Sequence, residues 1–163
     1  MSITEFFELA SFVVTVVALP FAIYTFIDQQ RKARENEEEA AYVSLSESYN
    51  RFLTLVLENP DLHLRTAHHT PNLTADQQER VLVIFEMLVS LFERAYLLLY
   101  EPELPPKAAR RWNSWTDYMH EWCRREDFRL LLPRMLEGED PEFAAFLRAL
   151  AAEEEAKAAA DAP

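Results

Sequence analysis

The stretch LASFVVTVVALPFAIYTFI, Leu9–Ile27, decides how the rest of the chain is interpreted, because it contains no charged residue. At ~1.5 Å per residue an α-helix of this length reaches ~28 Å, close to the ~30 Å hydrocarbon core of a bilayer. Its β-branched residues and Pro20 are poor choices for a soluble helix, but they are tolerated in lipid. The run therefore predicts an N-terminal transmembrane helix within residues 1–30.

The residues that flank this run distinguish a retained anchor from a cleaved signal peptide. A signal peptide needs basic residues before the apolar run and a small-x-small cleavage site after it. Here Glu5 and Glu8 precede the run, and no such site follows. A signal peptide and a buried soluble helix remain the alternatives. Arg31, Lys32 and Arg34 follow the run, and basic residues favour the cytoplasmic side of a span. The sequence therefore predicts a bacterial inner-membrane protein with its N-terminus outside and the rest of the chain in the cytoplasm.

Small and hydroxyl residues within the run form one stripe, at steps of four, three, four and three. The stripe consists of Ser11, Thr15, Ala18, Ala22 and Thr25. In lipid, small residues mark the faces on which another helix packs closely. The stripe is consistent with self-association into a homo-oligomer, with packing on a different membrane protein, or with ordinary variation in an anchor. Membrane lipid is the partner that all three interpretations share.

Composition limits the fold and the class of partner. The chain has 163 residues, of which 50% are hydrophobic and only one is a glycine. This excludes a disordered chain, and it disfavours a turn-rich β-sandwich and a phosphate-binding loop. The net charge of −12 argues against general nucleic-acid binding. A single cysteine excludes an intrachain disulfide framework. The sequence therefore predicts an all-α protein.

The apolar spacing predicts a stalk helix over residues 31–60 and a cytoplasmic helical bundle over residues 61–150. The stalk acquires a packed face at three- and four-residue steps, formed by Tyr42, Leu45, Tyr49, Phe52 and Val56. Thr74 and Gln77 match a capping box, and Val81–Tyr100, apolar nearly all round, is expected to be the central helix. Asp140 before Pro141 should begin the last helix. Residues 151–163 form an acidic, Ala-rich tail that should fray.

A fourth helix, expected from Lys107 to Arg125, carries the largest aromatic surface. Its stripe consists of Trp112, Trp115, Met119 and Trp122. Such a stripe is typical of a buried core, and a groove for a partner is the alternative.

Motifs that would indicate catalysis or a cofactor are absent from the sequence. We find no glycine-rich phosphate loop, HExxH, nucleophile elbow or paired CxxC. His120 and Cys123, with His68 or His69 from a loop, form a weak candidate zinc set. Asn113 and His120 satisfy the loosest form of the HEPN ribonuclease pair. The neighbouring arginines, from Arg110 to Arg134, would pair with nearby acids or meet anionic lipid headgroups. We expect no cofactor.

The order of these features resembles that of small bacterial single-pass membrane proteins of unknown function. The resemblance rests on the N-terminal run, the basic stop, the acidic stalk, FERAYLLLYEP (92–102) and WNSWTDYMHEWCRREDFR (112–129). The general plan is also similar to that of the membrane-pore accessory proteins of RNA-targeting CRISPR systems. That likeness implies a helical, HEPN-like cytoplasmic domain and assembly as rings, and it assigns no role to an individual residue.

Together these observations predict a non-enzymatic inner-membrane protein that assembles through its span and its bundle. A pore or membrane effector in phage defence is one form of this function. An accessory subunit of a larger membrane complex and a membrane-tethered HEPN-like ribonuclease are the alternatives.

Overall fold

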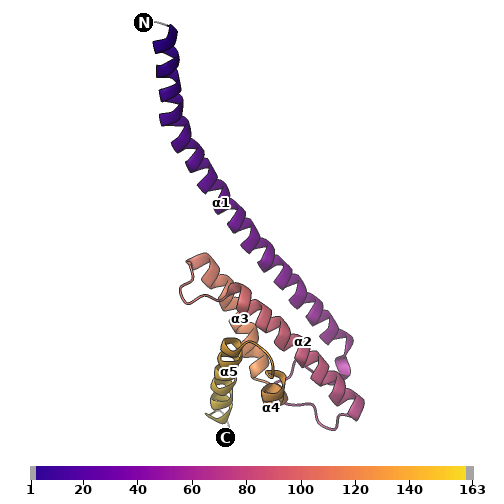
Figure 1. The fold of residues 1–163 in the computed structure, drawn as a ribbon. Helices are drawn as coiled ribbons and strands as arrows, with labels where there is room; N and C mark the ends of the chain where they lie inside the picture. The colour runs from indigo at the N-terminus through magenta and orange to yellow at the C-terminus, as the bar shows by residue number, and fades with distance from the viewer. Residues whose placement is uncertain (1–2, 161–163) are drawn as a thin grey trace. The chain divides into compact units, whose positions relative to one another are not determined.

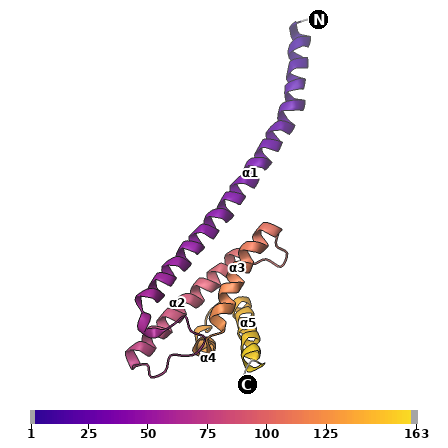
Figure 2. The same cartoon turned by 180° about the vertical axis from the view of Figure 1, so that it is seen from behind.

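The computed structural model describes the backbone of residues 3–160 and the side chains of residues 18–160. Its elements are α1 (Ile3–Glu58), the short 3₁₀ turn η1 (Pro60–Leu62), α2 (Ala75–Leu99), α3 (Pro106–Cys123), α4 (Glu126–Met135) and α5 (Pro141–Ala160), as Figures 1 and 2 show. No strand occurs within residues 3–160. The predicted all-α class is confirmed.

The chain divides into two compact units, residues 1–41 and residues 42–163. The division falls inside α1 and inside the range that the sequence analysis assigned to a stalk. In the first unit, exposed ion pairs one helical turn apart follow the apolar run: Lys32 Nζ lies 2.7 Å from Asp28 Oδ2, and Arg31 Nε lies 3.1 Å from Glu35 Oε1. Such pairs stabilise a helix surface modestly, by about 0.2–0.5 kcal/mol each.

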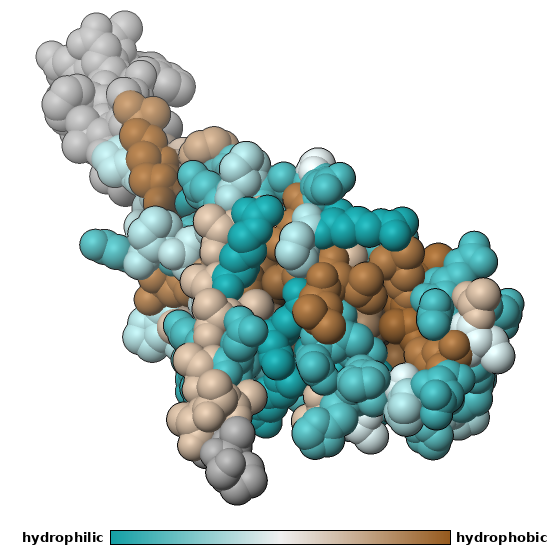
Figure 3. Space-filling view, turned by 90° about the horizontal axis from the view of Figure 1, so that it is seen from below, coloured by the Kyte–Doolittle hydropathy of each residue, from teal (hydrophilic) through white to brown (hydrophobic). Residues whose placement is uncertain are grey.

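The predicted span is described only in part. Residues 9–17 of it, with Ser11 and Thr15, lie outside the described side chains. Among the residues whose side chains the structure describes, no helix is long and apolar enough to cross a membrane. Large apolar side chains at the C-terminal end of the run are more than half exposed; they are Leu19, Phe21, Ile23, Tyr24, Phe26 and Ile27. Figure 3 shows apolar atoms where α1 leaves the grey region.

The last part of α1 belongs to the core of the second unit. Leu45, Tyr49, Phe52 and Val56 are buried there, which confirms the face predicted from their spacing. The Tyr49 hydroxyl accepts a hydrogen bond of 3.2 Å from the indole N–H of Trp122 on α3. Residues 42–58 therefore form one helix of the bundle, although they lie within residues 31–60, the range predicted to be a stalk.

Helix α2 begins at the predicted capping box. The Gln77 N–H donates to Thr74 Oγ1 at 3.2 Å, and the Thr74 N–H donates to Gln77 Oε1 at 2.9 Å. The helix contacts α3, α4 and α5, with Phe85, Leu88 and Phe92 fully buried between them. Helix α3 likewise contacts three helices, α2, α4 and α5. One face of α2 nevertheless remains uncovered.

Helix α5 begins where the sequence predicted and extends to Ala160. Asp140 Oδ1 accepts hydrogen bonds of 2.9 Å from the N–H groups of Glu142 and Phe143. Gly138, with φ +93°, supplies the turn before it, in a conformation that L side chains rarely adopt. Residues 151–160, which were expected to form a fraying helical tail, continue α5 as a helix, and Glu154 within them is buried. Residues 161–163 of the expected tail lie outside the described residues.

Candidate functional site

The aromatic stripe of α3 lies in the core. Trp115 and Met119 are essentially inaccessible, and Trp112 and Trp122 are buried. The Trp122 ring meets Phe85 of α2 edge to face at 6.2 Å between centroids, and Trp115 meets Tyr49 of α1 in the same manner at 5.8 Å. Edge-to-face pairs at these distances are favourable beyond the area they bury. The stripe thus joins α1, α2 and α3.

The described part of the small-residue stripe lies on the first unit. Ala18 and Ala22 are exposed. The Thr25 hydroxyl donates to the Ala22 carbonyl oxygen at 2.9 Å. A hydroxyl that is satisfied within its own helix carries no unpaired donor into an apolar environment, so Thr25 is compatible with lipid or with a closely packed helix.

The residues of the HEPN-type pair differ in their surroundings. Asn113 is exposed, whereas His120, two turns further along α3, is half-buried. His120 Nδ1 lies 3.0 Å from Glu154 Oε1 on α5. One ring nitrogen of His120 is thus occupied in holding α5, and no described groove brings Asn113 and His120 together.

Glu154 is the centre of a charged cluster that sequence reasoning missed. Its side chain is 4% exposed, and three basic side chains contact its carboxylate. His120 and Lys157 contact Oε1, with Lys157 Nζ at 2.6 Å. Arg124 Nε lies 3.3 Å from Oε2. Burial alone would raise the pKa of Glu154, but hydrogen bonds from Lys157 and His120 hold it below the usual value. The cluster ties α3 to α5. Two of the three contacts join residues at least thirty positions apart, so no local sequence pattern predicts them.

The candidate zinc residues do not form a metal site among the described residues. Cys123 is fully buried, and burial raises the pKa of its thiol to about 12. A thiol in that state is a poor nucleophile and a poor ligand at neutral pH. His69 Nδ1 lies 2.9 Å from Glu126 Oε2, and His68 is exposed. Residues 18–160 contain no group of three His, Cys, Asp or Glu side chains that could hold a metal ion.

Arg125 is a buried guanidinium that fixes the histidine-bearing loop. Its Nη1 donates to the carbonyl oxygens of His63 at 2.9 Å and Thr66 at 3.1 Å, and its Nη2 donates to Thr70 Oγ1 at 3.3 Å. Asp127 neutralises it, with Nε 2.7 Å from Oδ1. Loop carbonyls that would otherwise lack donors are thereby satisfied, which explains how a segment without regular structure holds its shape.

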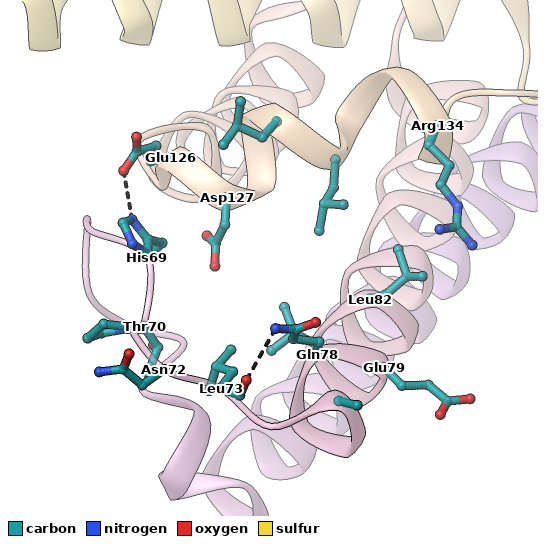
Figure 4. A pocket seen from close by; sticks show the side chains of 15 residues that line it. His69, Thr70, Asn72, Leu73, Gln78, Glu79, Leu82, Glu126, Asp127 and Arg134 are labelled. Carbon is teal, nitrogen blue, oxygen red and sulfur yellow. Dashed lines mark hydrogen bonds and ion pairs between the residues drawn. The ribbon is translucent and has the colours of Figure 1, made fainter.

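An open cleft of about 970 Å³ lies between this loop, the start of α2 and α4 (Figure 4). Its large aliphatic lining residues are Leu73, Val81, Leu82, Leu130 and Leu131. His69 and Glu126 close one end through a contact of 2.9 Å between Nδ1 and Oε2, and Arg134 stands at the other end. Asp127 points toward the cleft from α4, and Glu79 lies on its α2 edge.

Two of the three carboxylates in the cleft lining already have partners. The lining holds Glu79, Glu126, Asp127 and Arg134. Asp127 is neutralised by the buried Arg125 and Glu126 contacts His69, so the lining has no strong excess of one charge. The hydroxyl of Thr70 already donates to the Leu62 carbonyl oxygen at 2.7 Å. Among the hydrogen bonds of the described residues, His69 pairs with Glu126 and with no Ser, Thr or Cys side chain, so no hydroxyl or thiol is paired with this histidine.

Comparison with known proteins adds no assignment: no protein family, no curated protein and no solved structure matches this chain.

Proposed function

We propose that this chain is a non-enzymatic, membrane-anchored assembly protein of the bacterial inner membrane. The run Leu9–Ile27 crosses the bilayer with the N-terminus outside, and the helical bundle lies in the cytoplasm. The observation that carries the proposal is the continuity of α1, which runs as one helix from Ile3 to Glu58. The uncharged run and a core face of the bundle therefore belong to the same helix.

The exposed side chains of α1 support an apolar environment around the run. Phe21, Phe26 and Ile27 are each at least 60% exposed in the isolated chain. Leaving such side chains in water forgoes roughly 1.5–3 kcal/mol apiece relative to full burial. The helix surface then becomes charged from Asp28 onward, as expected where a helix leaves the hydrocarbon region.

Assembly is the second part of the proposal. In lipid, close packing of helices depends on small residues, and Ala18 and Ala22 offer such a face to a second span. A ring of spans that forms a pore in phage defence is one form of this assembly. Among the described residues, the lack of a hydroxyl or thiol paired with His69 and the inert thiol of Cys123 favour assembly over catalysis.

Cysteine accessibility in intact bacteria tests the anchor. Ala160→Cys and Ser2→Cys variants of the full chain would be treated with a membrane-impermeant thiol reagent before and after permeabilisation. Cys123 can remain, because its thiol is buried. We expect Ser2→Cys to react in intact cells and Ala160→Cys to react only after permeabilisation. Labelling of Ala160→Cys from outside would reverse the topology, and recovery of the chain in the soluble fraction would contradict the anchor.

A further inference from the structure

Helix α2 carries an outward-facing stripe that no other part of the second unit covers. We call it the α2 stripe; it consists of Val83, Glu86, Met87, Ser90, Arg94, Leu97 and Leu98. Its four large apolar side chains are each 47% to 58% exposed. A helix that is apolar nearly all round is normally covered all round. The stripe is therefore a surface on which a partner is missing.

A shallow groove runs beside the stripe and could accommodate side chains of a partner. The groove has a volume of about 600 Å³ and lies between α2 and α1. The α1 wall is formed by Ser48, Arg51, Phe52 and Leu55, and the α2 wall includes Met87, Ser90 and Arg94. The lining is mostly apolar, so contact with a second helix would remove apolar surface from water.

The sequence of the stripe is symmetric about Ser90. Glu86 lies four residues before Ser90 and Arg94 four residues after it, or ~6 Å to either side along the helix. Val83 and Leu97 lie seven residues before and after it, or ~10.5 Å to either side. When two identical helices run antiparallel and cross at Ser90, Glu86 of each meets Arg94 of the other. Val83 of each likewise meets Leu97 of the other.

The charges on the stripe lack partners within the chain. Among the interactions of residues 18–160, neither Glu86 nor Arg94 has an ion pair or a side-chain hydrogen bond. An antiparallel pair of α2 helices would form two such ion pairs at once. Ser90 at the crossing point has a small side chain, which lets the two backbones approach closely. Apolar contact, charge pairing and steric fit thus all select the same partner.

We propose that two copies of this chain dimerise through the α2 stripe, with their α2 helices antiparallel and related by a two-fold axis at Ser90. The interface is isologous, because the same residues of both copies form it. The proposal rests on the proposed function only in that the chain self-associates. It names the α2 stripe as the surface through which the cytoplasmic bundles contact each other. It does not require the span to pack against another span.

Charge reversal tests the pairing. The full chain in mild detergent would be studied by sedimentation, in the wild-type background and in an Ala18→Leu/Ala22→Leu background that perturbs the span. In Glu86→Arg, the arginine at position 86 of each copy would face Arg94 of the other copy, and the two like charges would repel. We therefore expect the variant dimer to dissociate at concentrations at least tenfold higher than those at which the wild-type dimer dissociates. Arg94→Glu should act in the same direction. The double variant Glu86→Arg/Arg94→Glu restores opposite charges and should recover the wild-type dissociation constant within about threefold.

Matched variants separate the interface from general charge effects. Glu155→Arg makes the same charge change on an exposed position of α5 and should leave the mass unchanged. Ser90→Cys should form a covalent dimer under mild oxidation, whereas Leu130→Cys, on the 74% exposed position of α4, should not. Melting followed by circular dichroism would show that the variants are folded.

Two results would overturn the proposal. One is a sedimentation mass that charge reversal leaves unchanged in both backgrounds, as expected if the stripe lies on a membrane surface. The other is crosslinking at Ser90→Cys no faster than at Leu130→Cys. Either result leaves the anchor standing, because thiol labelling at Ala160→Cys reports on the anchor separately.

Discussion

At the scale of single residues, Glu154 is a buried carboxylate that three basic side chains contact. Replacing it with glutamine keeps the shape but removes the charge that His120, Lys157 and Arg124 contact. Hydrogen bonds to charged groups contribute roughly 1.5–3 kcal/mol in proteins, and two of these partners are largely solvent-exposed. We expect Glu154→Gln to lower the free energy of unfolding by about 1–3 kcal/mol, measured by urea denaturation at pH 7.

The neighbouring residue supplies the control for this variant. Glu153 is exposed, so Glu153→Gln should change stability by no more than about 0.5 kcal/mol. The contribution of Glu154 to stability also depends on pH. Because the pKa of Glu154 in the folded chain lies below its usual 4.5, its contribution is complete above that pH and is lost as the pH falls through the folded-state pKa. Equal stability of both variants at pH 7 would contradict the role of Glu154.

The pKa of Glu139 is shifted in the opposite direction from that of Glu154. Burial and a hydrogen bond with Glu93 raise the pKa of Glu139 to about 7 from the usual 4.5. Glu93 also accepts the Asp140 N–H at 2.6 Å, so its carboxylate is held in place. A raised carboxyl pKa favours folding fully below pH 4.5, and this contribution is lost as the pH rises through about 7.

Replacing Glu139 with glutamine should therefore stabilise the chain at high pH. Glutamine stays neutral and can still donate to Glu93, so we expect the free energy of unfolding at pH 8 to rise by about 1–2 kcal/mol. The decline in stability between pH 5 and pH 8 should also become shallower. Thermal melts across that range would show it, with Glu137→Gln on an exposed position as the control. A parallel decline in wild type and Glu139→Gln would refute this prediction.

At the scale of elements, α3 contributes the aromatic residues on which the bundle is built. Trp115 is 1% exposed and contacts Tyr49 and Tyr118. Truncation would leave a large cavity, so we expect Trp115→Ala to cost about 3–5 kcal/mol. Leu130→Ala, at a 74% exposed site, should cost at most about 0.5 kcal/mol. Guanidinium denaturation measures both, and a small effect at Trp115 would mean that it is not part of the core.

The elements that sequence predicted correctly are those that local patterns specify. The three- and four-residue spacing of Leu45, Tyr49 and Phe52 identified a packed face, and Thr74 with Gln77 identified a helix start. Each of these signals lies within one or two turns of a helix. The same spacing shows that a face is packed but not which helices pack on it, so it does not show that residues 42–58 belong to the bundle.

The contacts that sequence did not predict join distant segments. Glu154 lies in an Ala- and Glu-rich stretch that reads as a fraying tail, and only its neighbours on α3 make it a buried residue. Arg125 is one arginine among several, and its carbonyl acceptors lie about sixty positions earlier in the chain. The uncovered face of α2 was hidden for a related reason. Composition shows that a helix is apolar all round, but only packing shows which side is left exposed.

At the scale of the whole molecule, the two proposed sites of self-association lie in different compact units. The small-residue stripe belongs to residues 1–41 and the α2 stripe to residues 42–163. Apolar packing in water can hold the second, whereas only close contact in lipid can hold the first. Variants of the two surfaces should therefore have separable effects on assembly.

Enlarging the small residues of the span tests this separation. In Ala18→Leu/Ala22→Leu, leucine is at least as favourable in lipid as alanine, so the chain should still insert into the membrane. The larger side chains should keep neighbouring spans apart, so crosslinking between copies at a Thr15→Cys position should fall at least severalfold. Crosslinking at Ser90→Cys should persist, because α2 is unchanged. If Thr15→Cys crosslinks equally well with and without the leucines, the small residues do not form a packing face, and assembly then depends on the bundle alone.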